Sequence, residues 1–308
     1  MTDKLVVGLV DGANYQKQFI EILFLTLFPN KKVLIKLKLQ QEPDYLVYST
    51  FGEEHKKYNN CYKLLINTKS TNLKDYNPDF IIDTTNDVKH IPENEKMVYI
   101  PHYVISFYER FRNVPNSLIK PSDYNVEQIL QSKNKFCAFL YHNCEIKYRN
   151  KFFHTLTKYK KVDALGKCLS NNKECDRFFF KENKISYHDL AVMKYRSYKF
   201  VICFESKKRS GYISEKIINA MLANAIPIYY GPNEIVEHFN NNAFINSNDF
   251  ENFDELAEYV KKVDTDDALY KKMLQEPWLH NNKLTNWFSI GMFASVINNV
   301  IKQKQSEK

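Results

Sequence analysis

Short apolar runs alternate with segments of helical periodicity along most of this 308-residue chain. The apolar runs expected to form strands are 5–11, 32–39, 44–50, 61–67, 79–83, 96–100, 135–141, 162–165, 200–204, 225–230 and 243–246. The segments with helical spacing are 14–28, 103–112, 147–159, 186–196, 212–224, 253–263, 266–275 and 283–303. Strands that alternate with helices favour a mostly parallel sheet with helices on its faces. The order therefore predicts an α/β fold.

The alternation weakens at 113–133, where two prolines and little periodicity interrupt it. Because 308 residues exceed what one core usually holds, we place a domain boundary there, giving domains 1–125 and 126–308. Two such halves predict a cleft between them, and ligands of open α/β sheets bind outside the carboxyl ends of the strands. The turns that follow strands in the second half are therefore candidates for a site, namely 142–148, 166–172 and 205–212.

The formal net charge of +8 favours an anionic ligand, but the basic residues are dispersed along the chain. No basic stripe or nucleic-acid-binding motif accompanies this charge, so we expect no nucleic acid partner. The apolar runs are shorter than the ~20 residues of a membrane span, and the N-terminal run is too short for a signal peptide. The sequence thus predicts a soluble, cytoplasmic protein without an integral membrane segment.

Six cysteines lie at positions 61, 137, 144, 168, 175 and 203. They form no C-x-x-C pair, and no cysteine–histidine spacing matches a zinc site. We interpret them as free thiols in a reducing compartment. Cys137 and Cys203 lie inside apolar runs and are expected to be small core residues.

Basic residues accompany the first two of these turns. Arg149 directly follows the turn at 142–148, and Lys167 lies within the turn at 166–172. Arg149 lies in the first turns of a predicted helix, where free N–H groups and an arginine can bind phosphate together. An exposed arginine on a surface helix is the alternative. Gly166 and Lys167 end the next strand, where glycine lets the backbone approach a ligand and lysine adds charge. A plain surface turn is the alternative there.

The third turn, KKRSGYISEK (207–216), leads into the predicted helix 212–224. Tyr212, Glu215 and Lys216 have the i, i+3, i+4 spacing of one helical face at the start of that helix. A lysine there opposes the helix dipole, and a bound anion would remove the conflict. The carboxylate beside it could bond to sugar hydroxyls or stabilise positive charge on a sugar ring. A surface glutamate next to a surface lysine is the alternative.

The stretch FVICFESKKRSGYISEKIINAMLANAIPIYYGP (200–232), called the signature segment below, resembles the signature of the α-1,3/α-1,4-fucosyltransferases, glycosyltransferase family ten. The stretches KFCAFLYHNCEIKYRNKFFHTL (135–156) and VDALGKC (162–168) resemble other parts of that family's donor domain. The resemblance, to a soluble member of bacterial or viral type, covers roughly residues 45–290. It implies a GT-B fold with two Rossmann-like domains, the acceptor site in the N-terminal one and GDP-fucose in the C-terminal one. The last helical segment is then a candidate to pack back on the N-terminal domain.

The resemblance also implies roles for single residues. Lys167 would face the pyrophosphate, and Lys216 would contact the phosphates. Glu215, the leading catalytic candidate, would contact the fucose. Tyr212 would pack on the nucleotide sugar or bond to it, and Arg149 would lie on the donor side.

Two further donor-site positions are implied directly after the strand 200–204. Glu205 and Ser206 take the places of a Glu-Asn pair in the family signature. Serine has a shorter side chain than asparagine and lacks its amide, so this contact differs from that of the family.

The implied reaction is the inverting transfer of L-fucose from GDP-fucose to a hydroxyl, O3 of a GlcNAc-type sugar, in an oligosaccharide or glycoconjugate. GDP-fucose is a co-substrate, and no tightly bound cofactor is implied. We predict no metal site, because lysine and arginine side chains would neutralise the pyrophosphate. The chain could instead use a different GDP-deoxyhexose donor, or it could bind a GDP-sugar with weak or no catalysis.

The general base is where the chain departs from the family. The family places a glutamate in a Tyr-Thr-Gly-Glu-Asn segment after the strand equivalent to 61–67, to take the proton of the acceptor hydroxyl. Here the stretch 67–73 reads NTKSTNL, with Lys69 or Ser70 at that place. A lysine of ordinary pKa is protonated at neutral pH, and it serves as a base only if burial lowers its pKa. The other candidates are Asp75, Glu53, Glu54 and Asp83. An unusual acceptor would also account for the departure.

Overall fold

The computed structural model describes residues 3–68, 73, 75–86, 96–110, 115–171 and 186–306. The chain divides into two compact units. Unit 1 comprises Met1–Glu109, Arg209–Ile213 and Asn286–Lys308, and unit 2 comprises Arg110–Lys208 and Ser214–Thr285. The boundary between the units after the N-terminal sheet lies between Glu109 and Arg110. The sequence pattern predicted it between residues 125 and 126. A five-residue piece of the signature segment, Arg209–Ile213, belongs to unit 1, and we call it the signature turn.

Unit 1 is built on a six-stranded sheet in which every neighbouring pair of strands is parallel. The strands are β1 (Lys4–Leu9), β2 (Lys32–Lys36), β3 (Tyr45–Ser49), β4 (Tyr62–Asn67), β5 (Phe80–Asp83) and β6 (Met97–Tyr99), in the order β2-β1-β3-β4-β5-β6. The register pairs Asn67 with Asp83 and Asp83 with Tyr99, so the last residues of β4, β5 and β6 lie side by side at one edge.

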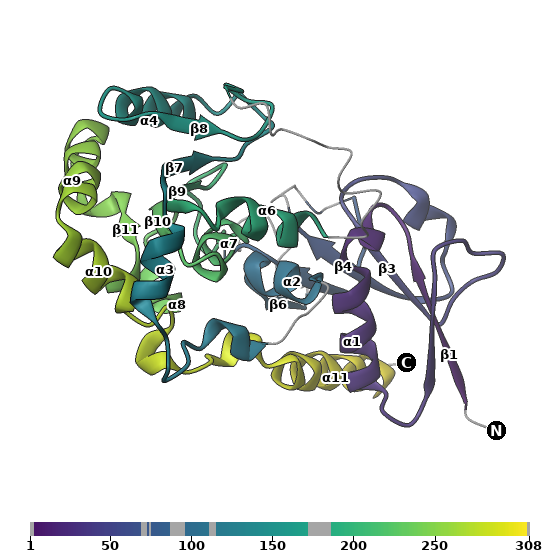
Figure 1. Ribbon diagram of the computed structural model, residues 1–308. Coiled ribbons are helices and arrows are strands. Elements are labelled where there is room, and N and C mark those ends of the chain that lie inside the picture. The colour runs from purple at the N-terminus through teal and green to yellow at the C-terminus, as the bar shows by residue number, and fades with distance from the viewer. Residues whose placement is uncertain are drawn as a thin grey trace. The chain divides into compact units, whose positions relative to one another are not determined.

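The helices described in unit 1 are η1 (Ala13–Gln16), α1 (Lys17–Leu27), η2 (Glu54–Lys57), α2 (His102–Tyr108), η8 (Asn286–Phe288) and α11 (Ile290–Ser306). Helices α1 and α2 bury apolar side chains in the core of this unit. Phe19, Ile20 and Leu23 of α1 are fully buried. The C-terminal helix α11 packs on α1 (Figure 1). The Tyr108 hydroxyl donates to the Phe288 carbonyl oxygen at 2.8 Å. The end of the chain is therefore part of unit 1.

Unit 2 contains a five-stranded sheet whose neighbouring strands are also parallel. The strands are β7 (Lys135–Phe139), β8 (Val162–Ala164), β9 (Tyr198–Phe204), β10 (Ile226–Tyr230) and β11 (Ile245–Asn246), in the order β11-β10-β9-β7-β8. The central strand β9 is almost wholly buried, which matches its continuous apolar run.

The helices of unit 2 are η4 (Pro115–Leu118), α3 (Val126–Ser132), α4 (Lys147–Thr157), α6 (Tyr187–Tyr195), α7 (Lys216–Leu222), α8 (Ile235–His238), η5 (Asn241–Ala243), η6 (Ser247–Asp249), α9 (Phe253–Thr265), α10 (Asp267–Gln275) and η7 (His280–Asn282). Aromatic rings fill the core between helices and sheet. The Phe204 ring centroid lies 5.0 Å from that of Phe152 on α4 and 5.7 Å from that of Phe253 on α9. The predicted α/β class with two Rossmann-like units is confirmed. Among the described residues, no helix combines the length and apolar character of a membrane span.

Candidate functional site

The signature segment follows β9 and enters α7 later than the sequence predicts. The predicted helix 212–224 begins only at Lys216, with Glu215 as its N-terminal cap. Gly211 has a left-handed φ of 70°, and the Ile213 amide donates to the Gly211 carbonyl oxygen at 2.9 Å. Residues 212–215 therefore precede the helix rather than form its first turn. The prediction that Tyr212, Glu215 and Lys216 share one helical face is wrong.

The physical reason is the buried carboxylate of Glu205, directly after β9. Its Oε1 accepts the backbone N–H of Ser214 at 2.7 Å, and its Oε2 accepts the Ser214 hydroxyl at 2.7 Å. The Lys216 ammonium donates to the same Oε2 at 3.2 Å and to the Ser214 hydroxyl oxygen at 2.7 Å. The side chain of Glu205 is 0% exposed. This buried carboxylate therefore fixes the positions of Ser214 and Lys216 from inside the protein.

Lys216 thus has its charge balanced inside the protein. Its side chain is 24% exposed, and its Nζ also lies 3.9 Å from Oε1 of Glu215. The conflict between this lysine and the dipole of α7 is offset by two carboxylates. The conflict for which the sequence suggested a bound anion is thus already offset within the protein, although the Lys216 side chain is still partly exposed.

A buried arginine that the sequence analysis did not single out supports α7. Arg110 is 2% exposed and donates to the Asn219 side-chain oxygen, while its Nη1 lies 3.6 Å from Oδ1 of Asp189 on α6. Burial lowers the pKa of Arg110, and the carboxylates of Asp189 and Glu215 oppose that shift. The sequence signal was a charged residue at the end of an apolar helix pattern, which does not reveal a buried partner.

Arg149 also lies inside unit 2. It is 5% exposed, its Nε donates to the Phe204 carbonyl oxygen at 3.0 Å, and its guanidinium lies 4.3 Å from the centroid of the Tyr141 ring. The neighbouring Tyr148 hydroxyl donates to the Glu205 carbonyl oxygen at 2.5 Å. The alternative of an exposed arginine on a surface helix is therefore wrong, because α4 directs this residue toward the carboxyl end of β9.

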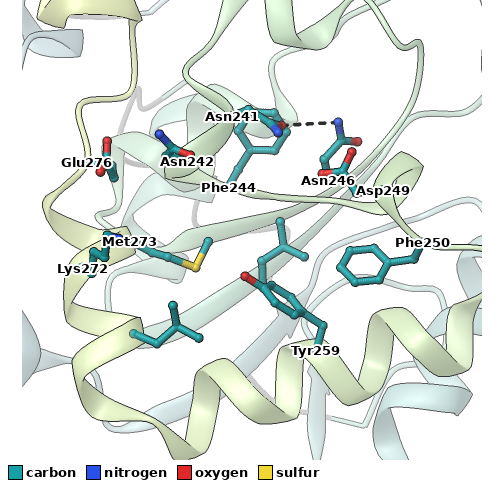
Figure 2. A pocket seen from close by; sticks show the side chains of 12 residues that line it. Asn241, Asn242, Phe244, Asn246, Asp249, Phe250, Tyr259, Lys272, Met273 and Glu276 are labelled. Atoms are coloured by element: carbon teal, nitrogen blue, oxygen red, sulfur yellow. Dashed lines mark hydrogen bonds between the residues drawn. The ribbon is translucent and has the colours of Figure 1, made fainter.

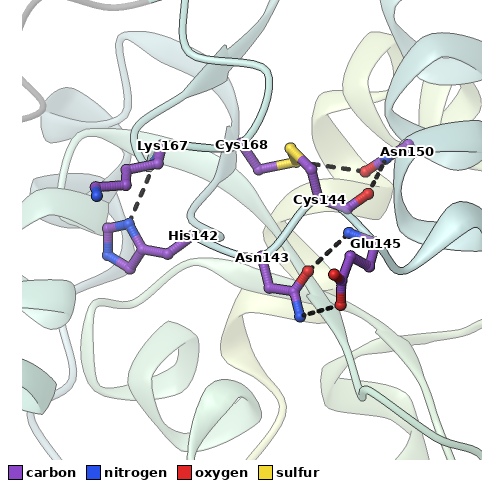
Figure 3. The surroundings of a disulfide bond; sticks show 7 residues. All are labelled: His142, Asn143, Cys144, Glu145, Asn150, Lys167 and Cys168. Carbon is purple, nitrogen blue, oxygen red and sulfur yellow. Dashed lines mark hydrogen bonds between the residues drawn. A yellow bond between two sulfur atoms is a disulfide. The ribbon is translucent and has the colours of Figure 1, made fainter.

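A disulfide between Cys144 and Cys168 joins the turn after β7 to the turn after β8 (Figure 3). The interpretation of all six cysteines as free thiols is wrong for this pair, because the two turns meet only in the folded chain. Cys61, Cys137 and Cys203 are free. Position 175 lies outside the described residues. Disulfides persist in oxidising surroundings, so this pair gives no support to a reducing compartment.

Lys167 is placed by the same two turns. Its backbone N–H donates to Nδ1 of His142 at 3.2 Å, and its side chain is exposed (Figure 3). A Cβ at Gly166 would clash with the Tyr141 carbonyl oxygen, so only glycine allows the turns to approach this closely. The predicted glycine–lysine turn is thus a close packing contact, and Lys167 points its charge outward from it.

The signature turn is bonded to the carboxyl-end edge of the sheet in unit 1. The Asn86 N–H donates to the Ser210 carbonyl oxygen at 3.1 Å, and the Tyr99 hydroxyl donates to the Gly211 carbonyl oxygen at 2.7 Å. The Tyr103 N–H donates to the Ile213 carbonyl oxygen at 3.0 Å. Tyr212, predicted on the donor side, is half-buried among unit 1 residues, whereas Ser206 is half-buried in unit 2.

The carboxylates considered as general bases differ sharply in exposure. Asp83 is fully buried at the end of β5, and its Oδ1 accepts the Thr85 N–H at 2.8 Å and the Thr85 hydroxyl at 3.0 Å. Burial raises the pKa of Asp83, while hydrogen bonds from Thr85 and Asn67 oppose that shift. The remaining candidates are exposed carboxylates, Glu53, Glu54 and Asp75. Lys69 and Ser70 lie outside the described residues.

One Asp-x-Asp sequence, Asp264-Thr265-Asp266, occurs in unit 2 and has a structural role. The buried Asp264 carboxylate lies 3.0 Å from the ammonium of Lys160 and 2.7 Å from that of Lys199. Asp266 accepts the Leu269 N–H and caps α10. Across the part of the chain that the structure describes, no group of three or more metal-ligating side chains occurs.

A cavity of about 450 Å³ opens beside β11, between η5, α9 and α10 (Figure 2). Its wall is Asn241, Asn242, Phe244, Ile245, Asn246, Asp249, Phe250, Tyr259, Leu269, Lys272, Met273 and Glu276. None of the residues predicted to bind the donor lines it.

Two parallel α/β units define a protein of the GT-B class of fold. A crystal structure of an α1,3-fucosyltransferase with GDP-fucose superposes with a TM-score of 0.70, at 20% identity, over 97% of this chain and 91% of that one. The family model of "Glycosyltransferase family 10 (fucosyltransferase) C-term" matches residues 130–301. This range is more than half of the chain, and the protein belongs to that family.

The curated relatives are matched over part of their length. A putative fucosyltransferase of Acanthamoeba polyphaga mimivirus is 38% identical over 192 residues, 62% of this chain and 30% of the relative. The alpha-(1,3)-fucosyltransferase FucT of Helicobacter pylori is 33% identical over 145 residues, 47% of this chain and 28% of the relative. A GDP-fucose protein O-fucosyltransferase 3 of Xenopus laevis is 29% identical over 175 residues, 53% of this chain and 36% of the relative. The chain thus spans about a third of the length of these relatives.

Proposed function

We propose that the protein transfers L-fucose from GDP-fucose to a hydroxyl of a glycan, O3 of a GlcNAc-type sugar, with inversion at the anomeric carbon. The observation that carries this proposal is the buried Glu205–Ser214–Lys216 network, which fixes a cation in the signature segment. The segment lies within the residues matched by the family model. The mimivirus and Helicobacter relatives named as fucosyltransferases support the same activity.

The donor site proposed for unit 2 uses basic side chains against the pyrophosphate. Lys216 and the exposed Lys167 supply charge for GDP, whose phosphate oxygen gains charge as the bond to the sugar breaks. Glu215, 13% exposed beside Lys216, is proposed to contact the fucose and stabilise the positive charge that develops on its ring. Arg149 stays on the donor side as a mostly buried cation at the end of β9.

One of the predicted donor contacts, Glu205, changes its proposed role, and another, Tyr212, keeps it. Glu205 has no exposed surface, so we assign it as a positioning residue that acts through Ser214 and Lys216 rather than as a donor contact. Tyr212 keeps its proposed contact with the nucleotide sugar, because it is half-buried and lies two residues before the donor-side part of the segment, which begins at Ser214.

The acceptor has two candidate classes. The Helicobacter relative is named as an α-(1,3)-fucosyltransferase, which favours a glycan hydroxyl. The Xenopus relative is named as a GDP-fucose protein O-fucosyltransferase, which makes a protein hydroxyl the second candidate. A different GDP-deoxyhexose donor would keep the fold and the type of reaction, and a GDP-sugar-binding protein with little catalysis would keep only the fold.

The test is a transfer assay with purified protein. GDP release from GDP-fucose would be measured with N-acetyllactosamine, with GlcNAc-terminated glycans and with hydroxyl-bearing peptides, and the product linkage and anomeric configuration assigned by NMR. We expect acceptor-dependent GDP release and an inverted α1,3-linked fucose. Binding of GDP-fucose by calorimetry without GDP release from any acceptor would leave a binding protein. Absence of GDP-fucose binding, with another GDP-sugar bound instead, would change the donor.

A further inference from the structure

Transfer of a sugar to a hydroxyl releases the hydroxyl proton, and some group beside the acceptor must take it. Two of the carboxylates considered as general bases, Glu53 and Asp83, are poorly suited to this task. The side chain of Glu53 is 80% exposed and pairs with Lys56 at 2.7 Å, and Asp83 is fully buried with Oδ1 already bonded twice. We propose, resting on the function proposed above, that His102 takes the proton of the acceptor hydroxyl.

His102 occupies the right edge of the sheet for this role. It is the first residue of α2 and follows β6 after only Ile100 and Pro101. The last residues of parallel strands meet at one edge of a sheet, and this is the edge at which α/β proteins bind their ligands. The side chain of His102 is half-buried, unlike Asp83, which pairs with Tyr99 in the register and is wholly buried.

The signature turn places a predicted substrate contact directly against this histidine. The ring centroids of His102 and Tyr212 are 6.2 Å apart, and the ring planes are inclined by 46°. The next residue, Tyr103, donates its N–H to the Ile213 carbonyl oxygen at 3.0 Å, so the start of α2 and the turn are held together by the backbone. His102 thus lies against the signature turn.

The chemistry fits a neutral imidazole. Nδ1 of His102 lies 3.2 Å from the Ser106 hydroxyl oxygen, one helical turn further along α2. We assign the proton of His102 to Nδ1, donating to Ser106, which makes Nε2 the basic atom. Histidine is the side chain that most often acts as a general base, whereas a lysine of ordinary pKa is protonated at neutral pH.

Bond making and bond breaking balance in this step. The acceptor oxygen forms a bond to the anomeric carbon, the bond from that carbon to the phosphate oxygen breaks, and its electron pair leaves with GDP. The proton of the acceptor hydroxyl passes to Nε2, and the imidazolium returns it to solvent. Ser106 positions the ring by accepting from Nδ1 throughout.

Other ionisable groups near His102 can also contribute to the pH dependence of the transfer rate. Helix α1, which packs against α2, carries Lys17 and Glu21, and Glu109 lies at the end of α2 itself. The signature turn, which contacts the start of α2, carries Arg209 and Tyr212. Asp83, whose carbonyl oxygen accepts the Ile100 N–H at 2.9 Å, lies just before this position in the sheet. The test therefore includes Asp83→Asn as a second arm.

The experiment compares the wild type with His102→Gln in the transfer assay from pH 5 to 9. We expect kcat to fall about 10²–10⁴-fold, the loss typical for a removed general base, with the acidic limb of the profile abolished. The Kd for GDP-fucose should stay within about twofold by calorimetry, which also shows that the variant is folded. Imidazole added to His102→Gly should restore part of the rate. His154→Gln, at an exposed histidine on α4, is the matched control.

Ser106→Ala keeps the imidazole and removes its partner, so it should lower kcat about tenfold and leave donor affinity unchanged. If the wild type transfers fucose and His102→Gln keeps its rate and its acidic limb, this inference is overturned and the proposed function stands. The same follows if the limb is lost in Asp83→Asn alone. A wild type that binds donor but transfers to no acceptor overturns both.

Discussion

The ammonium of Lys216 lies 3.2 Å from the buried Oε2 of Glu205, and the Ser214 hydroxyl bonds to both. This arrangement holds a lysine in one place before any ligand arrives. Because Glu205 also accepts the Ser214 backbone N–H, the turn that carries Glu215 is fixed by the same carboxylate. One buried acid therefore orders two residues that we propose to touch the donor, and this pre-organisation lowers the entropy cost of binding.

Removing the ammonium should weaken donor binding. Lys216→Met keeps much of the aliphatic side chain and deletes the charge, so we expect the Kd for GDP-fucose to rise about 10–100-fold, which is about 1.4–2.8 kcal/mol. The measurement is isothermal titration calorimetry with GDP and GDP-fucose. Lys261→Met, at a lysine of α9 whose side chain is 45% exposed and whose ammonium lies 3.2 Å from Oε2 of Glu258, is the control. Unchanged affinity in Lys216→Met would contradict the proposed phosphate contact.

Replacing the buried acid should act on stability as well as on binding. Glu205→Gln removes the charge that faces Lys216 and leaves a partly satisfied network, so we expect the free energy of unfolding to fall by about 3 kcal/mol. The change is read from urea unfolding at pH 7. The Kd for GDP-fucose should rise by less than in Lys216→Met, because the cation is displaced rather than deleted. A larger loss of affinity in Glu205→Gln would instead indicate that the acid touches the donor directly.

The disulfide should matter for the donor and for stability. Cys144 and Cys168 are separated by 24 residues, and by chain entropy closing such a loop stabilises the fold by about 3 kcal/mol. Cys144→Ser with Cys168→Ser should lower stability by about that amount. It should also raise the KM for GDP-fucose several-fold, because the turn that carries Lys167 loses its link to the turn after β7.

The donor effect separates from general damage by its kinetic pattern. We expect the double variant to change the KM for GDP-fucose more than the KM for the acceptor, and the wild type treated with dithiothreitol to behave like it. Cys61→Ser, at a half-buried free cysteine of unit 1, should change neither constant. Equal KM values with and without the disulfide would confine its role to stability.

Much of the fold could be predicted because parallel strands buried on both faces leave a strong sequence pattern. The run at 200–204 is part of strand β9, and the run at 61–67 contains β4. The start of α7 at Lys216 could not be predicted, because it depends on Glu205, eleven residues earlier. The carboxylate of Glu205 accepts the Ser214 N–H. Local periodicity at 212–216 is helical, and the tertiary hydrogen bond overrides it.

The candidate site was predictable as a set of residues and not as an arrangement. The signature segment identified Glu205 and Lys216, but no pattern indicates that one is fully buried beneath the other. The disulfide between Cys144 and Cys168 requires two turns after adjacent strands to meet, which is a property of strand order. His102 stands in an apolar segment, and only the contacts of the signature turn show that it lies against Tyr212.

A carboxyl of unit 1 that takes no part in the proposed donor site should make the stability of the protein depend on pH. Glu109 ends α2, and its Oε1 accepts the Phe19 N–H in the first turn of α1 at 2.7 Å. Burial raises the pKa of Glu109 from 4.5 to about 7, and backbone hydrogen bonds from Phe19 and Gln18 only partly oppose that shift. The folded state therefore holds this proton more tightly than the unfolded state does.

The sign follows from linkage: a group whose pKa is higher in the folded state loses its contribution to stability as pH rises from the unfolded to the folded value. Between about pH 4.5 and pH 7, Glu109 should lower the free energy of unfolding by on the order of 2–3 kcal/mol, with no further change above pH 8. Glu109→Gln keeps an oxygen that accepts from Phe19 and does not ionise, so it should remove this part of the slope. Urea unfolding at half-unit pH steps measures it, with Glu21→Gln, at an exposed glutamate of α1, as the control. An unchanged slope in Glu109→Gln would show that the proton is bound elsewhere.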